Sequence, residues 1–248
     1  MKRIASLLLL CLLVLSFSVA PAQDRKLTLG AGKPVAAAGG SVSFDAKSNS
    51  SGFVSTLTFS HVMGSGSNGY LAVMFAYRGD VPNFTSVTWN GTAMNARFAV
   101  DNPAFDNVCV GVYELVAPAS GTHDVVITLS VTKVIVASAI SYTGVNQTTP
   151  IPATGTTTAS GTNNTPTATL TPTGAGSSGA YFSFVAADGN LTDTPDTGWT
   201  TDSNVTQDSL VMGAASHKAG ASSVTRTDTL SASATAGWWV WIGYVQAA

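Results

Sequence analysis

The sequence has few charged residues and no cluster of basic ones. Only 10% of its 248 residues are Asp, Glu, Lys or Arg, and the formal net charge at pH 7 is −2. Proteins that bind nucleic acid or anionic membranes usually carry a basic patch or a basic amphipathic helix. The sequence contains neither pattern, so its composition argues against both kinds of partner.

Cysteine is almost absent. Cys11 lies in an N-terminal apolar stretch that we expect to be removed, which leaves Cys109 without an internal partner. A disulfide therefore cannot stabilise the mature chain. We expect Cys109 to be a small buried hydrophobe and the fold to be stabilised by its core.

The sequence also lacks the common catalytic patterns. Glu114 is the only glutamate, whereas a glycosidase normally uses two carboxylates at a defined separation. An Asp could partner Glu114 in a polysaccharide-degrading enzyme, but a structural ion pair with Arg78 or Arg97 is the favoured interpretation. The three histidines lie in separate segments, and no G-x-S-x-G motif occurs. A non-catalytic protein is the favoured hypothesis.

The first residues have the pattern of a secretory signal. Lys2 and Arg3 precede an apolar run that ends in Ala20-Pro21-Ala22, a small-residue cleavage site. A membrane anchor would need about 20 apolar residues without such a site. The pattern predicts a signal peptide over 1–22, an exposed leader over 23–40 and a single domain over 41–248. The mature protein is expected to be secreted, either extracellular or periplasmic, without membrane insertion.

The segment 107–151 has the most regular β pattern. Apolar and mostly polar residues alternate from Asp124 to Val131, as in a strand with one dry face. We expect three successive strands here, near 108–117, 124–131 and 134–143. Upstream, Asn90-Gly91 between apolar runs predicts a hairpin that pairs 87–89 with 93–100.

No helical periodicity persists in the mature chain, and roughly twelve strands with short turns are expected. The prediction is an all-β fold, a two-sheet antiparallel β-sandwich of jelly-roll-like type. The segments 70–77 and 181–187 are almost continuously apolar. This favours strands buried between two layers over the alternating strands of an outer-membrane barrel.

Several turn and strand motifs resemble a known class of modules. These are YELVAPASGTHDVVITLS at 113–130, SYTGVNQTTPI at 141–151, VTWNGTAM at 87–94 and WWVWIGYV at 238–245. Together they resemble secreted and phage-associated bacterial β-sandwich modules, and the resemblance spans roughly residues 53–245. It implies a jelly-roll-like fold. It carries no catalytic signature and assigns no functional residue.

One loop is rich in side-chain oxygens. Calcium binds roughly six to eight oxygens, and the loop offers five donor residues, namely Asp188, Asn190, Asp193, Asp196 and Asp202. Asp and Asn are also common in turns because they bond to their own backbone. Turn formation is the favoured interpretation and calcium the alternative; no other cofactor is expected.

Tryptophans form the second candidate site, because aromatic faces stack on the apolar faces of sugar rings. The predicted ligand-binding residues are Trp199, which lies among polar loop residues, and Trp239 and Trp241, which share one face of the last strand. Burial of both faces of the last strand is the favoured interpretation for Trp239 and Trp241, whereas Trp199 is expected to be exposed. The favoured function is binding of a glycan or other cell-surface polymer, or a contribution to an extracellular assembly through oligomer formation. The alternatives are a polysaccharide-degrading enzyme and a purely structural module.

Overall fold

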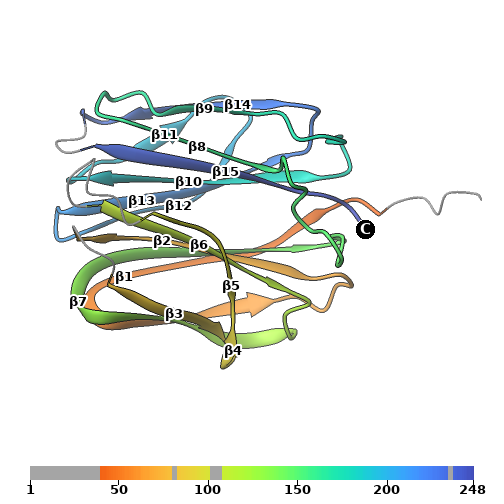
Figure 1. Ribbon diagram of the computed structural model, residues 1–248, viewed down its shortest axis with the longest axis horizontal. Helices are drawn as coiled ribbons and strands as arrows, with labels where there is room; N and C mark the ends of the chain where they lie inside the picture. The colour runs from red at the N-terminus through yellow and green to blue at the C-terminus, as the bar shows by residue number, and fades with distance from the viewer. Residues whose placement is uncertain (1–39, 80–82, 101–107, 234–236) are drawn as a thin grey trace, which may run out of the picture. The chain divides into compact units, whose positions relative to one another are not determined.

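The computed structural model describes residues 40–79, 83–100, 108–233 and 237–248. These residues form only strands and loops (Figure 1), and none of them belongs to a helix that could span a membrane. The strands are β1 (Ser43–Met63), β2 (Tyr70–Arg78), β3 (Phe84–Trp89), β4 (Thr92–Ala93), β5 (Asn95–Val100), β6 (Val108–Val116), β7 (Gly121–Thr143), β8 (Thr156–Gly161), β9 (Thr167–Leu170), β10 (Ala180–Asp188), β11 (Asp193–Pro195), β12 (Thr200–Gln207), β13 (Val211–Ala219), β14 (Val224–Leu230) and β15 (Trp238–Val245). All pairings between them are antiparallel, which confirms the predicted all-β antiparallel class.

The largest sheet has the strand order β4-β3-β7-β2-β6-β5, with β1 also paired to β7. The first part of β7 pairs with β3, its second part pairs with β2, and β1 follows β7 along its length. The sheet therefore folds over on itself and encloses a core that includes Leu57, Val73, Phe75, Trp89 and Ile127. The expectation of two separate strands at 124–131 and 134–143 is wrong, because both segments belong to the continuous strand β7.

A five-stranded sheet, β12-β13-β10-β15-β8, and a three-stranded sheet, β11-β14-β9, follow in the chain. Between these two sheets lies a second core, with Tyr181, Val185 and Val240 among its members. The opposite face of the five-stranded sheet packs on β2, β6 and β7 through Phe182, Phe184 and other apolar residues. We call this third apolar layer the shared core layer. Figure 1 shows the resulting succession of strand layers from β9 and β14 to β1 and β3.

The pairing pattern of 43–143 occurs again in 156–245. In the first half β2 lies between β6 and the second part of β7, and in the second half β10 lies between β13 and β15. Strand β5 pairs with β6, and β12 pairs with β13, each with a β-bulge near its start. The two parts of β1 correspond to β8 and β9, and β3 corresponds to β11. The chain is thus built from two halves of the same strand order.

The sequences of the two halves share one clear similarity. Gly64-Ser-Gly-Ser-Asn-Gly69 precedes β2, and Gly174-Ala-Gly-Ser-Ser-Gly179 precedes β10, so glycines occupy the same three places in both segments. Close packing explains the glycine at the third place of each segment. A Cβ on Gly69 would lie 2.7 Å from the Met63 side chain, and one on Gly179 would lie 2.2 Å from the Tyr244 hydroxyl. The two segments therefore act as matching turns before the central strand of each half.

The Asn90-Gly91 turn is confirmed. It joins β3 to β4, Trp89 pairs with Thr92, and both turn residues have positive φ values of 48° and 75°. The expected continuation of this hairpin through residue 100 is wrong, because β5 pairs with β6 and not with β3.

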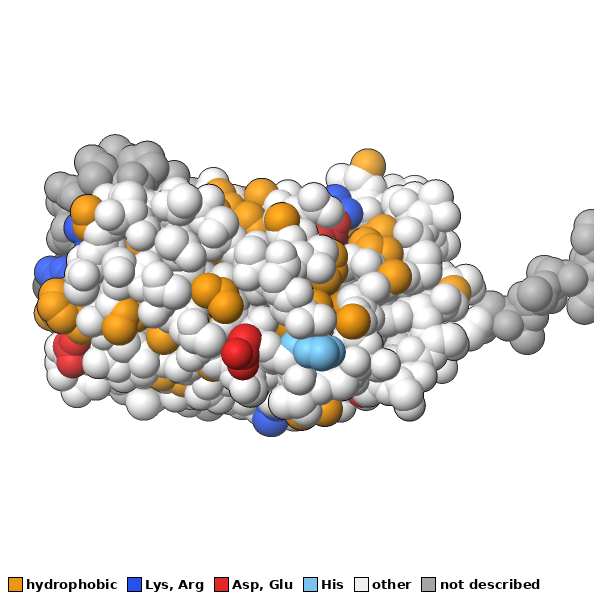
Figure 2. Space-filling model, turned by 90° about the horizontal axis from the view of Figure 1, so that it is seen from below, with side chains coloured by type: hydrophobic (Ala, Val, Ile, Leu, Met, Phe, Trp, Pro, Cys, Tyr) orange, Lys and Arg blue, Asp and Glu red, His pale blue; other side chains and the backbone are white. Residues whose placement is uncertain are grey.

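The outer face of the first half is mostly polar and uncharged. Exposed positions on β1 and β7 include Thr56, Thr58, Ser60 and Thr122. Figure 2, which views the molecule from below Figure 1, shows only scattered acidic, basic and histidine side chains on this side. The low charge content of the sequence is therefore also a property of this surface.

Candidate functional site

A pocket of about 400 Å³ opens where β1 begins, beside the end of β13. Both halves of the chain contribute to it: β1 and β7 come from the first, and β12 and β13 come from the second. We call it the Phe44 pocket. The side chains that could contact a ligand there include Phe44, Tyr142, Ser177, Thr200, His217 and Lys218.

A β-bulge in β1 sets the direction of the β1 side chains near the Phe44 pocket. The register between β1 and β7 shifts between Phe44 and Ala46, so Asp45 is the extra residue. In a regular strand, residues three apart point to opposite faces, and the bulge reverses this. As a result Phe44 and Lys47 both reach the second half of the chain, where they meet His217 and Asp202.

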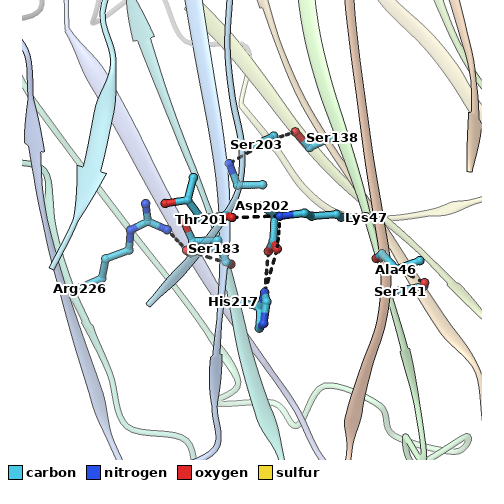
Figure 3. Close-up of polar contacts among 12 residues, drawn as sticks. Ala46, Lys47, Ser138, Ser141, Ser183, Thr201, Asp202, Ser203, His217 and Arg226 are labelled. Carbon is cyan, nitrogen blue, oxygen red and sulfur yellow. Dashed lines mark hydrogen bonds and ion pairs between the residues drawn. The ribbon is translucent and has the colours of Figure 1, made fainter. Parts of the chain in front are cut away.

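A second bulge, in β12, places the carboxylate at this site. The register with β13 shifts between Thr201 and Ser203, and Asp202 is the extra residue. Its two carboxylate oxygens lie 2.9 and 2.8 Å from His217 Nδ1 (Figure 3). Lys47 Nζ lies 3.6 Å from the same carboxylate and donates a hydrogen bond of 3.1 Å to the Thr201 carbonyl oxygen. Asp202 is therefore paired with both His217 and Lys47.

The carboxylate of Asp202 fixes the orientation of the His217 ring. An ionised carboxylate only accepts hydrogen bonds, so Nδ1 of His217 carries a proton and donates it. In the neutral ring Nε2 is then an acceptor, and after protonation it is a donor. No described residue forms a hydrogen bond with Nε2, and His217 lines the Phe44 pocket. The ring can therefore serve a ligand through its far nitrogen.

Phe44 lies flat against this imidazole. The two ring centroids are 4.2 Å apart with an interplanar angle of 14°, and the Phe44 side of the stack remains 37% exposed. The Phe44 ring is also nearly perpendicular to the Tyr142 ring, and their centroids are 6.0 Å apart. The stack gives the pocket a fixed aromatic wall.

Tyr142 brings an unsatisfied hydroxyl to the Phe44 pocket. The residue is fully buried, and its hydroxyl has no hydrogen-bond partner among the described residues. Burial, with a further contribution from the charge of Asp202, raises the pKa of Tyr142 well above its usual value. The hydroxyl therefore stays protonated.

The first half has an equivalent pair at its own bulge. Arg97 is the extra residue of β5, and its Nε lies 2.6 Å from Glu114 Oε1. The hydroxyl of Tyr70 donates a 2.9 Å hydrogen bond to the other oxygen of Glu114. The predicted structural ion pair of Glu114 is confirmed, with Arg97 as its partner. Each half therefore carries a pair of one carboxylate and one nitrogen group at its bulge. The bulge residue is the arginine in the first half and the aspartate in the second.

The predicted calcium ligands do not converge. Three of the five are each held by a different side chain: Asp188 by Arg78 at 3.5 Å, Asp193 by Arg226 at 2.8 Å, and Asp202 by His217 at 2.8 Å. The other two, Asn190 and Asp196, are exposed. In the part of the chain that the structure describes, no three His, Cys, Asp or Glu side chains gather as metal ligands would. The acidic residues of this loop are instead paired with cationic side chains or lie in turns.

The expected exposure of Trp199 is wrong. Its side chain is only 8% exposed and packs under the three-stranded sheet. Two cations cover its ring, with Arg226 Cζ at 5.2 Å and Lys218 Nζ at 5.8 Å from the centroid. A polar sequence around a tryptophan does not mean exposure when cationic side chains pack on the ring.

The two predicted binding tryptophans of the last strand, Trp239 and Trp241, also lie away from the Phe44 pocket. Trp241 is 1% exposed in the shared core layer, and Trp239 is half-buried with its ring 6.4 Å from Phe98. None of the three predicted aromatic residues lines the pocket. Sugar binding by these residues stays a prediction, and their burial gives it no support.

Sequence reasoning missed the residues of the Phe44 pocket because they come from five separate strands and from loops. The sequence holds one usable signal, a single Phe44 among polar neighbours, but a lone apolar residue at a strand start is common. Nothing in the linear spacing of Asp202 and His217 indicates that a bulge brings them together.

Comparison with protein-family models, with curated proteins and with solved structures finds no match for the chain. The geometry of the Phe44 pocket is therefore the basis on which a function can be assigned.

Proposed function

We propose that the protein is a secreted, non-catalytic module that binds a glycan on a surface, and that the Phe44 pocket is its binding site. The observation that carries this proposal is the exposed Phe44 ring, held flat on His217 at the wall of a pocket with both polar and apolar lining residues. A pyranose ring has an apolar C–H face that stacks on an aromatic ring. Its hydroxyls would find Thr200, Ser177 and the free nitrogen of His217 nearby.

The size of the pocket agrees with this proposal. Small-molecule sites usually measure roughly 300–1,000 Å³, and the Phe44 pocket measures about 400 Å³. This favours one or two sugar units over a long stretch of polymer. The chain would then recognise an end or a side branch of a surface glycan.

The proposal extends to the fold. We regard each half as a jelly-roll-like sandwich, in which a five-stranded layer faces a shorter one and the chain alternates between the two. The order β8-β15-β10-β13-β12 opposite β9-β14-β11 supports this arrangement. The Phe44 pocket then lies at the junction of two such units.

The state of the carboxylates favours binding over hydrolysis. The side chain of Asp202 is 1% exposed and is paired with Lys47 and His217. Glu114 is 4% exposed and is held by Arg97 and Tyr70. A glycosidase needs two carboxylates that reach the scissile bond. The polysaccharide-degrading alternative therefore has weaker support than binding.

A glycan array tests the proposal with a matched pair of variants. The mature chain from Gln23 is screened beside Phe44→Ala and Phe53→Ala. Both phenylalanines are exposed residues of β1, at 37% and 63%, but only Phe44 lines the pocket. We expect Phe44→Ala to weaken binding about tenfold, which corresponds to about 1.4 kcal/mol, and Phe53→Ala to leave it unchanged.

Three outcomes of the array have different meanings. Equal loss in both variants would remove the Phe44 pocket from the assignment. Absence of binding by the wild-type chain, with and without calcium, would overturn the glycan proposal and leave the structural or oligomer-forming alternative. Activity on a bound polysaccharide that Glu114→Gln abolishes would restore the enzyme alternative.

A further inference from the structure

The charged groups around the Phe44 pocket differ in how accessible they are. The side chain of Asp202 is 1% exposed, whereas the side chain of Lys47, its ion-pair partner, is 46% exposed. His217 and Lys218 both line the pocket. A ligand that enters the pocket therefore meets cationic or hydrogen-bonding nitrogen groups, while the carboxylate lies behind the imidazole.

Lys218 has no carboxylate partner among the described residues. Its Nζ lies 3.5 Å from the Thr197 carbonyl oxygen and 5.8 Å from the centre of the Trp199 ring. Both contacts hold the ammonium group in place, but neither neutralises its charge. This half-buried cation at the pocket is suited to a negatively charged group on a ligand.

Tyr142 adds a second, independent indication. Tyr142 lines the Phe44 pocket, and its fully buried hydroxyl has no hydrogen-bond partner among the described residues. A buried hydroxyl without a partner is unfavourable, and a ligand oxygen that displaced the residues over it would satisfy it. The pocket therefore offers a cation and a hydrogen-bond donor beside an aromatic wall.

We propose that the Phe44 pocket selects an acidic sugar, a uronic acid whose carboxylate is bound by Lys218. The sugar face stacks on Phe44, and Tyr142 donates to a ligand oxygen. This inference rests on the proposed glycan binding and names the class of sugar. The whole chain has a formal net charge of −2, so the preference for an anion is local to the pocket and not a property of the whole surface.

The test compares polymers that differ in their carboxylates. Affinities of the mature chain are measured for polygalacturonate, for the same polymer fully methyl-esterified, and for alginate. We expect the free acid forms to bind about tenfold tighter than the ester, with the difference shrinking as salt screens the charges. Dextran sulfate serves as a polymer of high charge without carboxylates.

Variants then assign the preference to one residue. Lys218→Gln should remove the difference between acid and ester, and Lys218→Arg should keep it, because the charge remains. Lys133→Gln is the matched control, since Lys133 is a half-buried lysine that does not line the Phe44 pocket. A thermal unfolding midpoint equal to that of the wild type shows that Lys218→Gln retains the fold around Trp199.

The outcomes separate this inference from the glycan proposal. Equal binding of the ester and the acid, or binding only of neutral glycans on the array, overturns the acidic-sugar inference and leaves glycan binding in place. Equal affinity for dextran sulfate overturns it too, since charge alone would then explain binding. Failure to bind any polymer overturns both.

Discussion

Arg226 is a fully buried arginine that two aspartates share. Its Nε lies 2.7 Å from Asp228, its Nη2 lies 2.8 Å from Asp193, and its Nη1 donates a hydrogen bond to Ser183. Burial raises the pKa of Asp193 to about 7, although the charge of Arg226 opposes this shift. The pKa of Asp228 is raised as well, again mainly by burial. One cation therefore does not fully compensate two buried carboxylates.

The first prediction concerns Asp193→Asn. The pKa of Asp193 in the folded protein, about 7, is above the ordinary value of 3.8, so the unfolded chain loses its proton first as the pH rises. The stability from this group is complete below pH 4 and is lost as the pH rises to about 7. Asparagine cannot ionise, so the variant should gain stability relative to the wild type over that range. Urea unfolding at several pH values measures the difference, and parallel profiles would contradict the prediction.

His61 has the opposite dependence on pH. It is 1% exposed, its Nδ1 is hydrogen-bonded to Ser48 at 2.9 Å, and burial lowers its pKa to about 4 against the opposing charge of Asp45. The stability from the neutral ring is complete above pH 6.5 and is lost as the pH falls to about 4, by on the order of 3 kcal/mol. Over this pH range, the changes in wild-type stability that come from His61 and from Asp193 therefore have opposite signs.

The second prediction follows for His61→Gln. Glutamine retains a polar group near Ser48 but cannot take up the proton, so the acid-side loss should disappear. We expect the variant to become more stable relative to the wild type as the pH falls from 6.5 to 4. The same urea series measures this, and a difference that stays constant with pH would refute it.

At the scale of the element, the turn between β3 and β4 depends on backbone conformation. Gly91 has a φ of 75°, and a Cβ there would meet no atom within 4 Å. The third prediction is that Gly91→Ala lowers the unfolding free energy by roughly 1 kcal/mol through backbone strain alone. Gly176→Ala is the control, because that position also has free space but no positive φ. Equal effects of the two substitutions in thermal unfolding would argue against the backbone explanation.

Strands with a regular alternation or a long apolar run could be predicted from the sequence, and β2, β6, β10 and β15 are examples. The separation of β7 into two strands is wrong because the alternation of polar and apolar residues breaks at Thr132 and Lys133, whereas both lie within one continuous strand. Strand β12 was missed because polar residues dominate it. Its stability comes from pairing with β13, which the local sequence does not encode.

The site was harder to predict than the strands for a geometric reason. A bulge changes the face of every residue on one side of it, so a strand pattern alone cannot place Phe44 and Lys47 together. Burial of Trp199 depends on Lys218 and Arg226, which are distant in sequence. Both features depend on how strands pair with one another. A single sequence does not show this pairing directly.

At the scale of the whole molecule, the two halves meet through the shared core layer. The second half contributes Phe182, Phe184 and Trp241 to this layer, and the first contributes Tyr70 and Met74, all at most 1% exposed. Either half alone would expose this apolar face to water. Large exposed apolar patches promote association, so each half needs a partner for this face.

The fourth prediction is that the chain can be cut between the halves and still assemble. Ala153 and Thr154 are exposed in the connection between β7 and β8, and a cut there leaves the pairings of both halves intact. The fragments 23–153 and 154–248, produced together, should form a one-to-one complex, because the shared core layer is restored. Produced alone, each should self-associate through the same face. Size-exclusion chromatography with light scattering measures the assembly of the fragments produced together and produced alone.

Two monomeric fragments that each unfold cooperatively would instead make the halves independent domains, against the prediction of one domain over 41–248.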